Sequence, residues 1–498
     1  MKEYDQMLKT SKEVHYIERA IGLLGWDERT YMPKGAVRGR AETKAYLSKL
    51  HHQKLTSDKL KKLLDKLNKP EVNDELSEIE KANVREMTRD FERYYNIPEE
   101  LIEKISKAAS EGQAAWEKAR EKSDFKMFLP YLKKNVELRK EAAEYIGYEN
   151  EPYDALLDSY DPGMTAKRVN EVFEPMKKEL SKIVDKIISQ DKKPGEGVFK
   201  DKKFPVDKQH ELCKKVAEDI GYNFDHGRLD KTSHPFTIGM GDDVRITNRY
   251  SENNLTSLYS LIHESGHAMY EQGKKPEWLG TPIGKSVSMG YHESQSRMWE
   301  NFVGRSREFM DYLYPHLVDR FPAMDSHDPD EFYNRINRVE PSFIRVDADE
   351  VTYNLHIALR FDIELGLFRD EIEPSETEVI WQNKMDDYFG IVPDDPAMGV
   401  LQDIHWSGGQ FGYFPSYALG NLIAAQLFDT ITDEIPDLRE KISSGEFSPL
   451  LNWLRENIHQ KGRKYLAPEL TEQVTGDEIK ADYHIDYIKE KFYPIYGL

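Results

Sequence analysis

Cysteine is almost absent from this chain of 498 residues, because Cys213 is the only one. A single cysteine excludes an intrachain disulfide, a cysteine-based zinc finger and an iron–sulfur cluster held by four thiolates of this chain. The opening residues, MKEYDQMLKTSKEVHY, also have no apolar stretch of the kind that a secretory signal carries. The sequence therefore fits a reducing compartment, and we expect a cytoplasmic protein.

Long apolar runs and an excess of positive charge are missing as well. No stretch approaches the roughly 18 apolar residues that a membrane helix needs. The chain has 90 acidic and 70 basic residues, which gives a formal charge of −20. A phosphate-coated partner would be repelled before any local contact formed. We therefore expect neither nucleic acid nor a membrane as a partner.

The sequence is rich in helical pattern. From Lys2 to about Gln190, charged stretches carry apolar residues three and four positions apart, as in Leu60, Leu63, Leu64 and Leu67. The polar segment Gln190–Gly197, QDKKPGEG, is the best candidate for a linker. We therefore divide the chain into a helical lobe, residues 1–195, and a second lobe, residues 196–498, which together form one domain.

A short β-like region follows the linker. Pro235–Met240 and Val244–Thr247 flank the turn residues Gly241-Asp242-Asp243, which predicts a small hairpin. Helical pattern resumes at about Asn254 and continues to the end of the chain. The expected fold is mostly α with one small β-sheet.

The strongest chemical signal is the run His263-Glu264-Ser265-Gly266-His267 inside a helical segment of the second lobe. Four residues at about 100° each place the two histidines only about 40° apart around the helix, so both imidazoles can reach one zinc ion. Glu264 lies beside that face, where its carboxylate can take a proton from metal-bound water. The alternative is two histidines on a helix face whose hydrogen bonds are already satisfied, with a solvated glutamate.

A catalytic zinc usually takes a third protein ligand. The longer form of the motif is absent, because Tyr270 and Gly273 stand where its glycine and third histidine would be. Glu293 lies on a second predicted helix, 26 residues after His267, which leaves room for a turn and an antiparallel return. Glu300, on the same face as Glu293, is a candidate hydrogen-bond partner for a ligand imidazole.

These blocks resemble the carboxypeptidase Taq family of zinc metallocarboxypeptidases. HESGH followed by His292-Glu293-Ser294-Gln295 is one matching pair, and Gly25-Trp26-Asp27 is similar to the amino-terminal region of the family. The remaining matching blocks, in order, are His234-Pro235-Phe236, Asp243-x-Arg245-x-Thr247, Ile344-Arg345 with Ala348-Asp349-Glu350, and Gly399-x-x-Gln402-Asp403-x-His405-Trp406. The resemblance thus spans the chain.

The resemblance implies a helical peptidase with a deep central cleft, similar in fold to neurolysin and angiotensin-converting enzyme, and a homodimer. It implies release of single amino acids from the carboxyl ends of peptides by a metal-activated water. It makes His263, His267 and Glu293 the metal ligands and Glu264 the general base. Zinc is the expected ion, although cobalt or manganese suits the same donors.

The reaction needs hydrogen-bond donors for a developing oxyanion. The segment that follows Gln402 offers His405 and Tyr417, with Tyr413 as a substitute for the tyrosine. The alternative is that these aromatic side chains only pack the wall of the cleft.

Recognition of a free peptide carboxylate suits a guanidinium group. Arg345 is the first choice, although it could pair instead with Asp347 or Asp349. Arg245 is a second candidate and could instead pair with Asp243. Arg228 is a further candidate, for closing the pocket beyond the terminal residue.

A strand and several histidines complete the expectations from the sequence. The strand Asp243–Thr247 is expected to offer an edge to a peptide backbone. His356 is either core or close to the site. The remaining histidines that lie in polar helical stretches are expected to be solvated, namely His51, His52, His210 and His459.

Two further functions stay open. The same metal chemistry could serve an oligopeptidase or a dipeptidyl carboxypeptidase. A non-catalytic peptide-binding scaffold with a vestigial metal site is the third reading, and the intact Glu264 argues against it.

Overall fold

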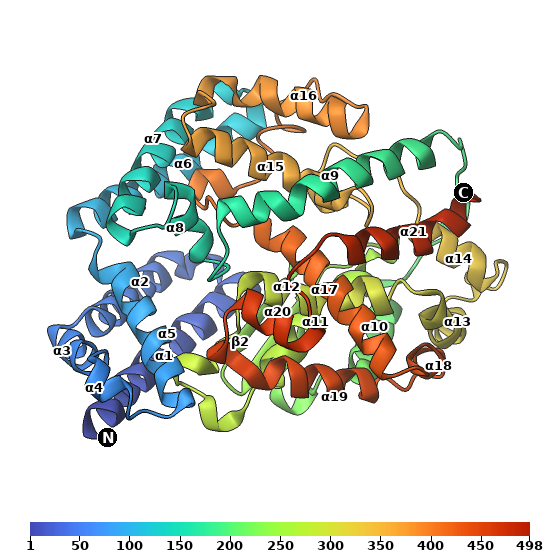
Figure 1. Ribbon diagram of the computed structural model, residues 1–498. Helices are drawn as coiled ribbons and strands as arrows, with labels where there is room; N and C mark the ends of the chain where they lie inside the picture. Colours follow the sequence, from blue (N-terminus) through green and yellow to red (C-terminus); the bar gives the residue numbers. More distant parts are fainter.

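The computed structural model describes residues 1–498 and is mostly helical with one small sheet (Figure 1), which confirms the predicted fold class. The helices of the first 190 residues are α1 (Lys2–Thr30), α2 (Val37–Leu55), α3 (Asp58–Leu67), α4 (Pro70–Asn73), α5 (Glu78–Tyr95), α6 (Glu99–Lys122), α7 (Phe125–Ile146), α8 (Pro152–Asp158) and α9 (Ala166–Ile188). The later helices are α10 (Val206–Ile220), α11 (Thr256–Gln272), α12 (Met289–Arg297), α13 (Arg307–Arg320), α14 (Pro329–Ile336), α15 (Tyr353–Phe368), α16 (Thr377–Phe389), α17 (Pro415–Glu434), α18 (Leu438–Ser443), α19 (Ser448–Asn457), α20 (Ala467–Thr475) and α21 (Asp482–Tyr496). None of them combines the length and the apolar character that crossing a membrane requires.

The local sequence explains where helices begin and which faces they bury. Ser77 and Glu80 form a capping box that starts α5. In α3, the four leucines at helical spacing are all buried, as the pattern predicts. Such a face stabilises a short helix mainly by removing apolar surface from water.

The sheet has three strands in the order β1-β3-β2, with β1 at Leu229–Lys231, β2 at Thr237–Met240 and β3 at Asp243–Asn248. The predicted hairpin is confirmed, because β2 and β3 pair antiparallel and Gly241 adopts φ +80° in the turn between them. Strand β1, parallel to β3, was not predicted. Because β3 is the central strand, both of its edges are paired, so the prediction that it offers a free edge to a peptide is wrong.

Two large hydrophobic cores, with a third cluster of four buried side chains on α6 and α7, make up the interior. Residues 4–91 build a core of eleven buried side chains of their own, and a main core of 96 buried side chains runs from Trp116 to Tyr496. The main core takes side chains from both sides of residue 195, and the lobe division at that residue stays a prediction. In Figure 1 helices α1–α5 gather at the lower left, apart from α15 and α16 at the top.

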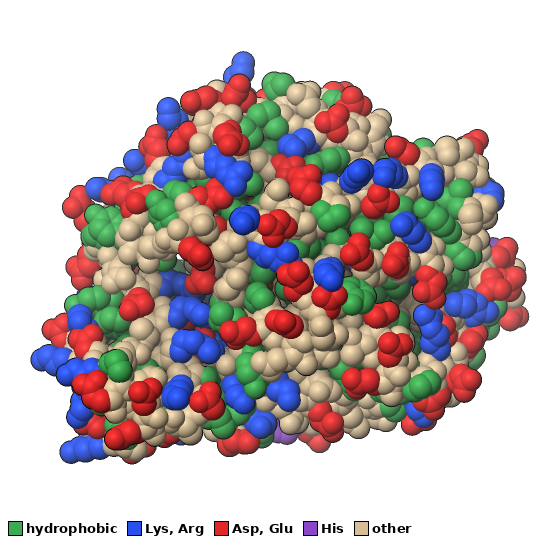
Figure 2. Space-filling view, viewed as in Figure 1, with side chains coloured by type: hydrophobic (Ala, Val, Ile, Leu, Met, Phe, Trp, Pro, Cys, Tyr) green, Lys and Arg blue, Asp and Glu red, His purple; other side chains and the backbone are tan.

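Two cavities lie along the boundary between these cores. The larger, of about 1030 Å³, lies between α5 and the segment around α8. Figure 2 shows a hollow at the left of the molecule with Lys and Arg side chains along it, and the cationic side chains that line the cavity are Lys81, Arg85, Arg89, Arg93 and Lys464. The second cavity, of about 710 Å³, lies between α1 and the ends of α11 and α12, where it reaches Glu271 and His292.

Three central helices, α11, α12 and α17, pack closely because glycines stand where they meet. A Cβ atom on Gly266 of α11 would lie 2.6 Å from the carbonyl oxygen of Gln295 in α12. A Cβ atom on Gly420 of α17 would lie 2.6 Å from the side chain of Glu293 in α12. The absence of a side chain at both positions lets α12 sit between its two neighbours.

Candidate metal centre and catalytic site

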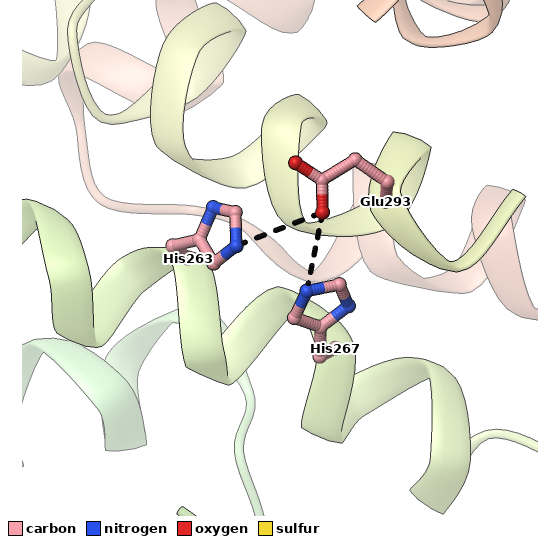
Figure 3. Close-up of side chains that lie close together, drawn as sticks. All are labelled: His263, His267 and Glu293. Atoms are coloured by element: carbon pink, nitrogen blue, oxygen red, sulfur yellow. Dashed lines mark ion pairs between the residues drawn. The ribbon is translucent and has the colours of Figure 1, made fainter. Parts of the chain in front are cut away.

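Two helices bring the three predicted metal ligands together. His263 and His267 project from α11, and Glu293 reaches them from α12 (Figure 3). The Oε2 atom of Glu293 lies 3.8 Å from Nε2 of His263 and 3.5 Å from Nε2 of His267. The donor atoms of the three side chains all lie within 4.8 Å of one another.

This donor set fits a divalent cation. Donors placed about 2.1 Å from one tetrahedral zinc ion are about 3.4 Å apart, close to the two separations between Glu293 and the imidazoles. Two imidazoles and a carboxylate are also the donor types that zinc takes in hydrolytic sites.

Each of the two predicted ligand imidazoles is oriented by a partner at its other nitrogen. Nδ1 of His263 lies 2.9 Å from Oε2 of Glu300, so Glu300 contacts one of the two imidazoles that the sequence predicts as ligands. Nδ1 of His267 lies 2.6 Å from Nδ1 of His292. With Nδ1 of each ring held in this way, both Nε2 atoms are directed toward Glu293.

Two arginines hold the carboxylates of the site ionised. Arg297 donates from Nε to Oε1 of Glu293 at 2.7 Å, and Arg305 donates to Oε1 of Glu300 at 3.1 Å. Burial alone would raise the pKa of Glu293, but Arg297 and the two imidazoles hold it well below its usual range. Burial also acts to raise the pKa of Glu300, but Arg297, His263 and Arg305 act to lower it, and its pKa is below the usual range. Glu300 belongs to the π-helical turn η5 (Met298–Val303), which continues α12.

Glu264 is held from the sheet. Its side chain is 8% exposed, and Thr237 of β2 lies with Oγ1 2.7 Å from Oε2 of Glu264 and 2.8 Å from its backbone carbonyl oxygen. The sheet therefore fixes one oxygen of the predicted general base.

The three predicted donors form one aromatic cluster at the start of α17. The ring of His405 lies 5.3 Å from that of Tyr413 and 6.4 Å from that of Tyr417. Burial lowers the pKa of His405 to about 4, while the charge of Asp403 raises it and those of Arg345 and Arg360 lower it. Burial raises the pKa of Tyr413 to about 12, and the charge of Glu293 contributes to that rise. Burial also raises the pKa of Tyr417, so all three side chains are neutral near pH 7.

Arg345 is buried, with 6% exposure, and pairs with Asp403. Its Nη2 and Nε donate to Oδ1 of Asp403 at 2.7 and 3.1 Å, and its Nη1 donates to the hydroxyl of Tyr353. The alternative partners considered from the sequence, Asp347 and Asp349, are not the ones observed. Arg360, which is fully buried, pairs with the other oxygen of the same Asp403.

Arg245 and Arg228 lie at the contact between α1 and the sheet. Arg245 pairs with Asp243, the ion pair that the sequence offered as its alternative role. Arg228 pairs with Asp230. Both guanidinium groups lie over the ring of Trp26, at 4.4 Å for Arg245 and 5.1 Å for Arg228.

Comparison with known proteins agrees with this geometry. The sequence model described as "Carboxypeptidase Taq (M32) metallopeptidase" matches residues 6–492. The chain belongs to the carboxypeptidase Taq family of metallopeptidases. It is therefore a metallocarboxypeptidase, a hydrolase that depends on a divalent metal, and the resemblance read from its motifs is confirmed.

The relatives within this family cover nearly the whole chain. Thermostable carboxypeptidase 1 of Thermus thermophilus is 41% identical over 99% of this chain and 99% of its own. Carboxypeptidase 1 of Bacillus subtilis is 40% identical over 100% of this chain and 99% of its own. Among solved structures, an M32 carboxypeptidase from Deinococcus radiodurans superposes with a TM-score of 0.96 at 35% identity, with complete coverage of both chains.

Some residues of the site were not found from the sequence. Thr237 contacts Glu264, Arg297 contacts Glu293, and Arg360 shares the partner Asp403 with Arg345. No spacing marked these three residues in advance. His459 was expected to be solvated, but this is wrong, because it is 1% exposed and bonds through Nε2 to Gln295. His356 is fully buried and stacks on Phe389, which makes it a core residue.

Proposed function

We propose that this carboxypeptidase releases single amino acids and that His263, His267 and Glu293 hold its metal ion, with zinc as the preferred ion and cobalt or manganese as alternatives. The convergence of these three side chains from two helices is the observation that supports the assignment. When bound, zinc supplies Lewis acidity that makes a water molecule acidic near neutral pH and polarises a carbonyl group.

Glu264 is proposed as the general base. Thr237 occupies its Oε2, which leaves Oε1 to accept the proton of the attacking water. The same carboxyl group then returns that proton to the departing amine. A carboxylate held on one side moves less, so it loses less freedom when substrate binds.

His405 and Tyr417 are proposed to donate hydrogen bonds to the oxyanion, with Tyr413 as the substitute for Tyr417. A neutral imidazole and a neutral phenol each keep a proton to donate at pH 7. The lowered pKa of His405 and the raised pKa of Tyr417, both set mainly by burial, support this role.

Arg345 is proposed to bind the substrate carboxylate. Arg345 and Arg360 together carry two positive charges against the one negative charge of Asp403. A buried set with one uncompensated positive charge is costly, and a carboxylate from the substrate would neutralise it. For Arg245 and Arg228 we propose a contribution to the substrate pocket through Trp26, which their guanidinium groups cover.

Digestion of a defined peptide tests the reaction. Stepwise loss of single residues from the carboxyl end, followed by mass spectrometry, is the expected result. Dipeptide products would favour a dipeptidyl carboxypeptidase, and internal fragments would favour an oligopeptidase. The Glu264→Gln variant should keep its metal and lose turnover, because the base is removed and the ligands remain. Full activity in that variant would contradict the mechanism.

Two properties of the whole protein belong to the same proposal. Cys213 is buried and unpaired, which suits the reducing cytoplasm. A homodimer is proposed from the family resemblance, and sedimentation of the purified protein should give about twice the chain mass of 58.1 kDa. A mass equal to one chain would contradict it.

A further inference from the structure

His292 stands between the ligand His267 and a buried carboxylate. Its Nδ1 lies 2.6 Å from Nδ1 of His267, and its Nε2 lies 3.1 Å from Oε1 of Glu271. His292 precedes Glu293 in α12, and Glu271 lies one turn beyond His267 at the end of α11. The two metal-bearing helices are thus joined a second time behind the ligand set.

Only one placement of protons on His267 and His292 is compatible with these hydrogen bonds and with a metal at His267. His267 can offer Nε2 to a metal only if its proton sits on Nδ1, because a neutral imidazole carries one proton. That proton must be donated to a lone pair on Nδ1 of His292. His292 must then carry its own proton on Nε2, where the carboxylate of Glu271 accepts it.

Glu271, the last residue of this hydrogen-bonded series, is itself held by further hydrogen bonds. Oε1 of Glu271 also accepts hydrogen bonds from Lys274 at 2.5 Å and Ser286 at 2.8 Å. Although Glu271 is buried, Lys274 and His292 hold the pKa of its carboxyl well below the usual range. Gly239 of β2 makes room for this carboxylate, because a Cβ atom there would lie 2.6 Å from Oε2 of Glu271.

We propose that His292 and Glu271 are positioning residues that fix the ring orientation and the tautomer of His267 for metal binding. The inference rests on the proposed metal site and adds to it. The two ligand imidazoles then differ in the partner that accepts their Nδ1 proton. For His263 the acceptor is the carboxylate of Glu300. For His267 it is the neutral imidazole of His292, which is itself bonded to the carboxylate of Glu271. Partners of this kind typically contribute 10- to 100-fold to metal affinity.

The test is Zn²⁺ affinity of the full-length, metal-stripped protein, measured by competition with a chelator. His292→Leu removes the acceptor for Nδ1 of His267 and should weaken Zn²⁺ binding about 10- to 100-fold. His292→Asn keeps an acceptor oxygen near the same place and should lose less. Glu271→Gln should fall between His292→Asn and the wild type.

Ser286→Ala is the matched control. It removes a hydrogen bond to the same oxygen of Glu271 but leaves the contact of Glu271 with His292, so its Zn²⁺ affinity should stay within about threefold of the wild type. Thermal unfolding of the metal-free proteins separates positioning from a general structural role. A structural role alone would lower the unfolding midpoint of His292→Leu and His292→Asn and leave their Zn²⁺ affinities unchanged.

The possible failures are distinguishable. If the wild type binds Zn²⁺ and cleaves peptides while both His292 variants and Glu271→Gln keep its affinity, only this inference is overturned. If the wild type does not bind Zn²⁺, the proposed metal site falls and this inference falls with it. If His292→Leu does not fold, the order of His292→Asn and Ser286→Ala decides the matter, because equal affinity in these two contradicts the inference.

Discussion

Thr237 lies on β2 and Glu264 on α11, so the orientation of the Glu264 carboxylate depends on a contact between the sheet and the helix. Thr237→Val keeps the shape of the side chain and removes the hydroxyl that donates to Oε2 of Glu264. Loss of one hydrogen bond to a charged group is worth about 1.5 to 3 kcal/mol. We expect kcat to fall about 10- to 100-fold, while metal content is unchanged.

The control for this prediction is Thr237→Ser, which restores a hydroxyl at the same position. Its kcat should return to within a few fold of the wild type, and metal analysis should find one ion per chain in both variants. A Thr237→Val protein with wild-type kcat would show that Glu264 needs no partner from the sheet.

Arg345 gives a second prediction at the scale of a single residue. Arg345→Ala should raise KM strongly for peptides with a free carboxylate and change little for the same peptides amidated at that end. Asp403 keeps Arg360 as a partner in the variant, which limits the structural damage. Steady-state kinetics on matched free and amidated peptides measures the difference. Equal effects on both substrates would remove Arg345 from carboxylate recognition.

At the scale of helices, α17 positions α12 through the bare backbone of Gly420. Gly420→Ala would place a methyl group 2.6 Å from Cβ and Cγ of Glu293, close to the main chain of α12, where little can give. Overpacking of this kind costs about 1 to 3 kcal/mol. We expect a lower unfolding midpoint and weaker metal binding, measured by calorimetry and chelator competition.

Gly25→Ala in α1 is the matched control for Gly420→Ala. A Cβ atom at Gly25 meets nothing within 4 Å, and alanine is the better helix former by about 1 kcal/mol. This variant should be as stable as the wild type or slightly more so, with unchanged metal affinity. If both alanines behave alike, the close approach of α17 does not set the position of Glu293.

Helix α15 controls the loop that carries the proposed donors. Glu364 accepts hydrogen bonds from Trp406 Nε1 at 2.7 Å and from the backbone N–H of Gly412 at 2.8 Å, which hold the two ends of the loop from His405 to Tyr413. Glu364→Gln puts an amide N–H group against one of these donors. We expect kcat to fall about tenfold, because one buried hydrogen bond is lost.

The hydroxyl of Tyr153 in α8 donates to the same carboxylate of Glu364 at 2.6 Å. Tyr153→Phe therefore disturbs Glu364 without releasing the loop, and it should lower the unfolding midpoint while kcat is kept. Similar kcat losses in Tyr153→Phe and Glu364→Gln would show that anchoring of the loop by Glu364 is not what sets kcat.

The elements also show what the sequence could and could not predict. The spacing of His263 and His267 follows from helical geometry, and the contact of Glu300 follows from its position on the face of Glu293. The ion pair of Arg345 joins it to Asp403, 58 residues away, and only the fold could show that partner. Strand β1, with three residues, is too short to show a pattern. His459 is buried against Tyr270 of α11 and Gln295 of α12, and the sequence around His459 cannot predict these distant contacts.

At the scale of the whole molecule, buried titratable groups of two kinds respond oppositely to acid. Burial lowers the pKa of His459 to about 3 and that of His484 to about 4, so these histidines stay uncharged when folded and gain protons when unfolded. Burial raises the pKa of Glu364 to about 7 and that of Asp349 to about 6, so these acids keep protons when folded that the unfolded chain has released.

The signs for stability follow from proton linkage. Between about pH 6.5 and 4, the unfolded chain binds the protons of the histidines and the folded chain does not, so each histidine lowers stability as the pH falls. For Glu364 the folded chain holds the extra proton between about pH 7 and 4.5, so this residue raises stability as the pH falls. Each fully titrating group contributes about 1.4 kcal/mol per pH unit.

Replacing one group of each kind therefore changes the acid response in opposite directions. His459→Gln removes a group that destabilises in acid, so its unfolding midpoint should fall less steeply than that of the wild type between pH 6.5 and 5. Glu364→Gln removes a group that raises stability as the pH falls, so the unfolding midpoint of this variant should fall more steeply over the same range. The slope of midpoint against pH, measured by circular dichroism on heating, is independent of the constant loss that either substitution causes through packing. Slopes that change in the same direction for both variants would contradict the opposite protonation of these two buried groups.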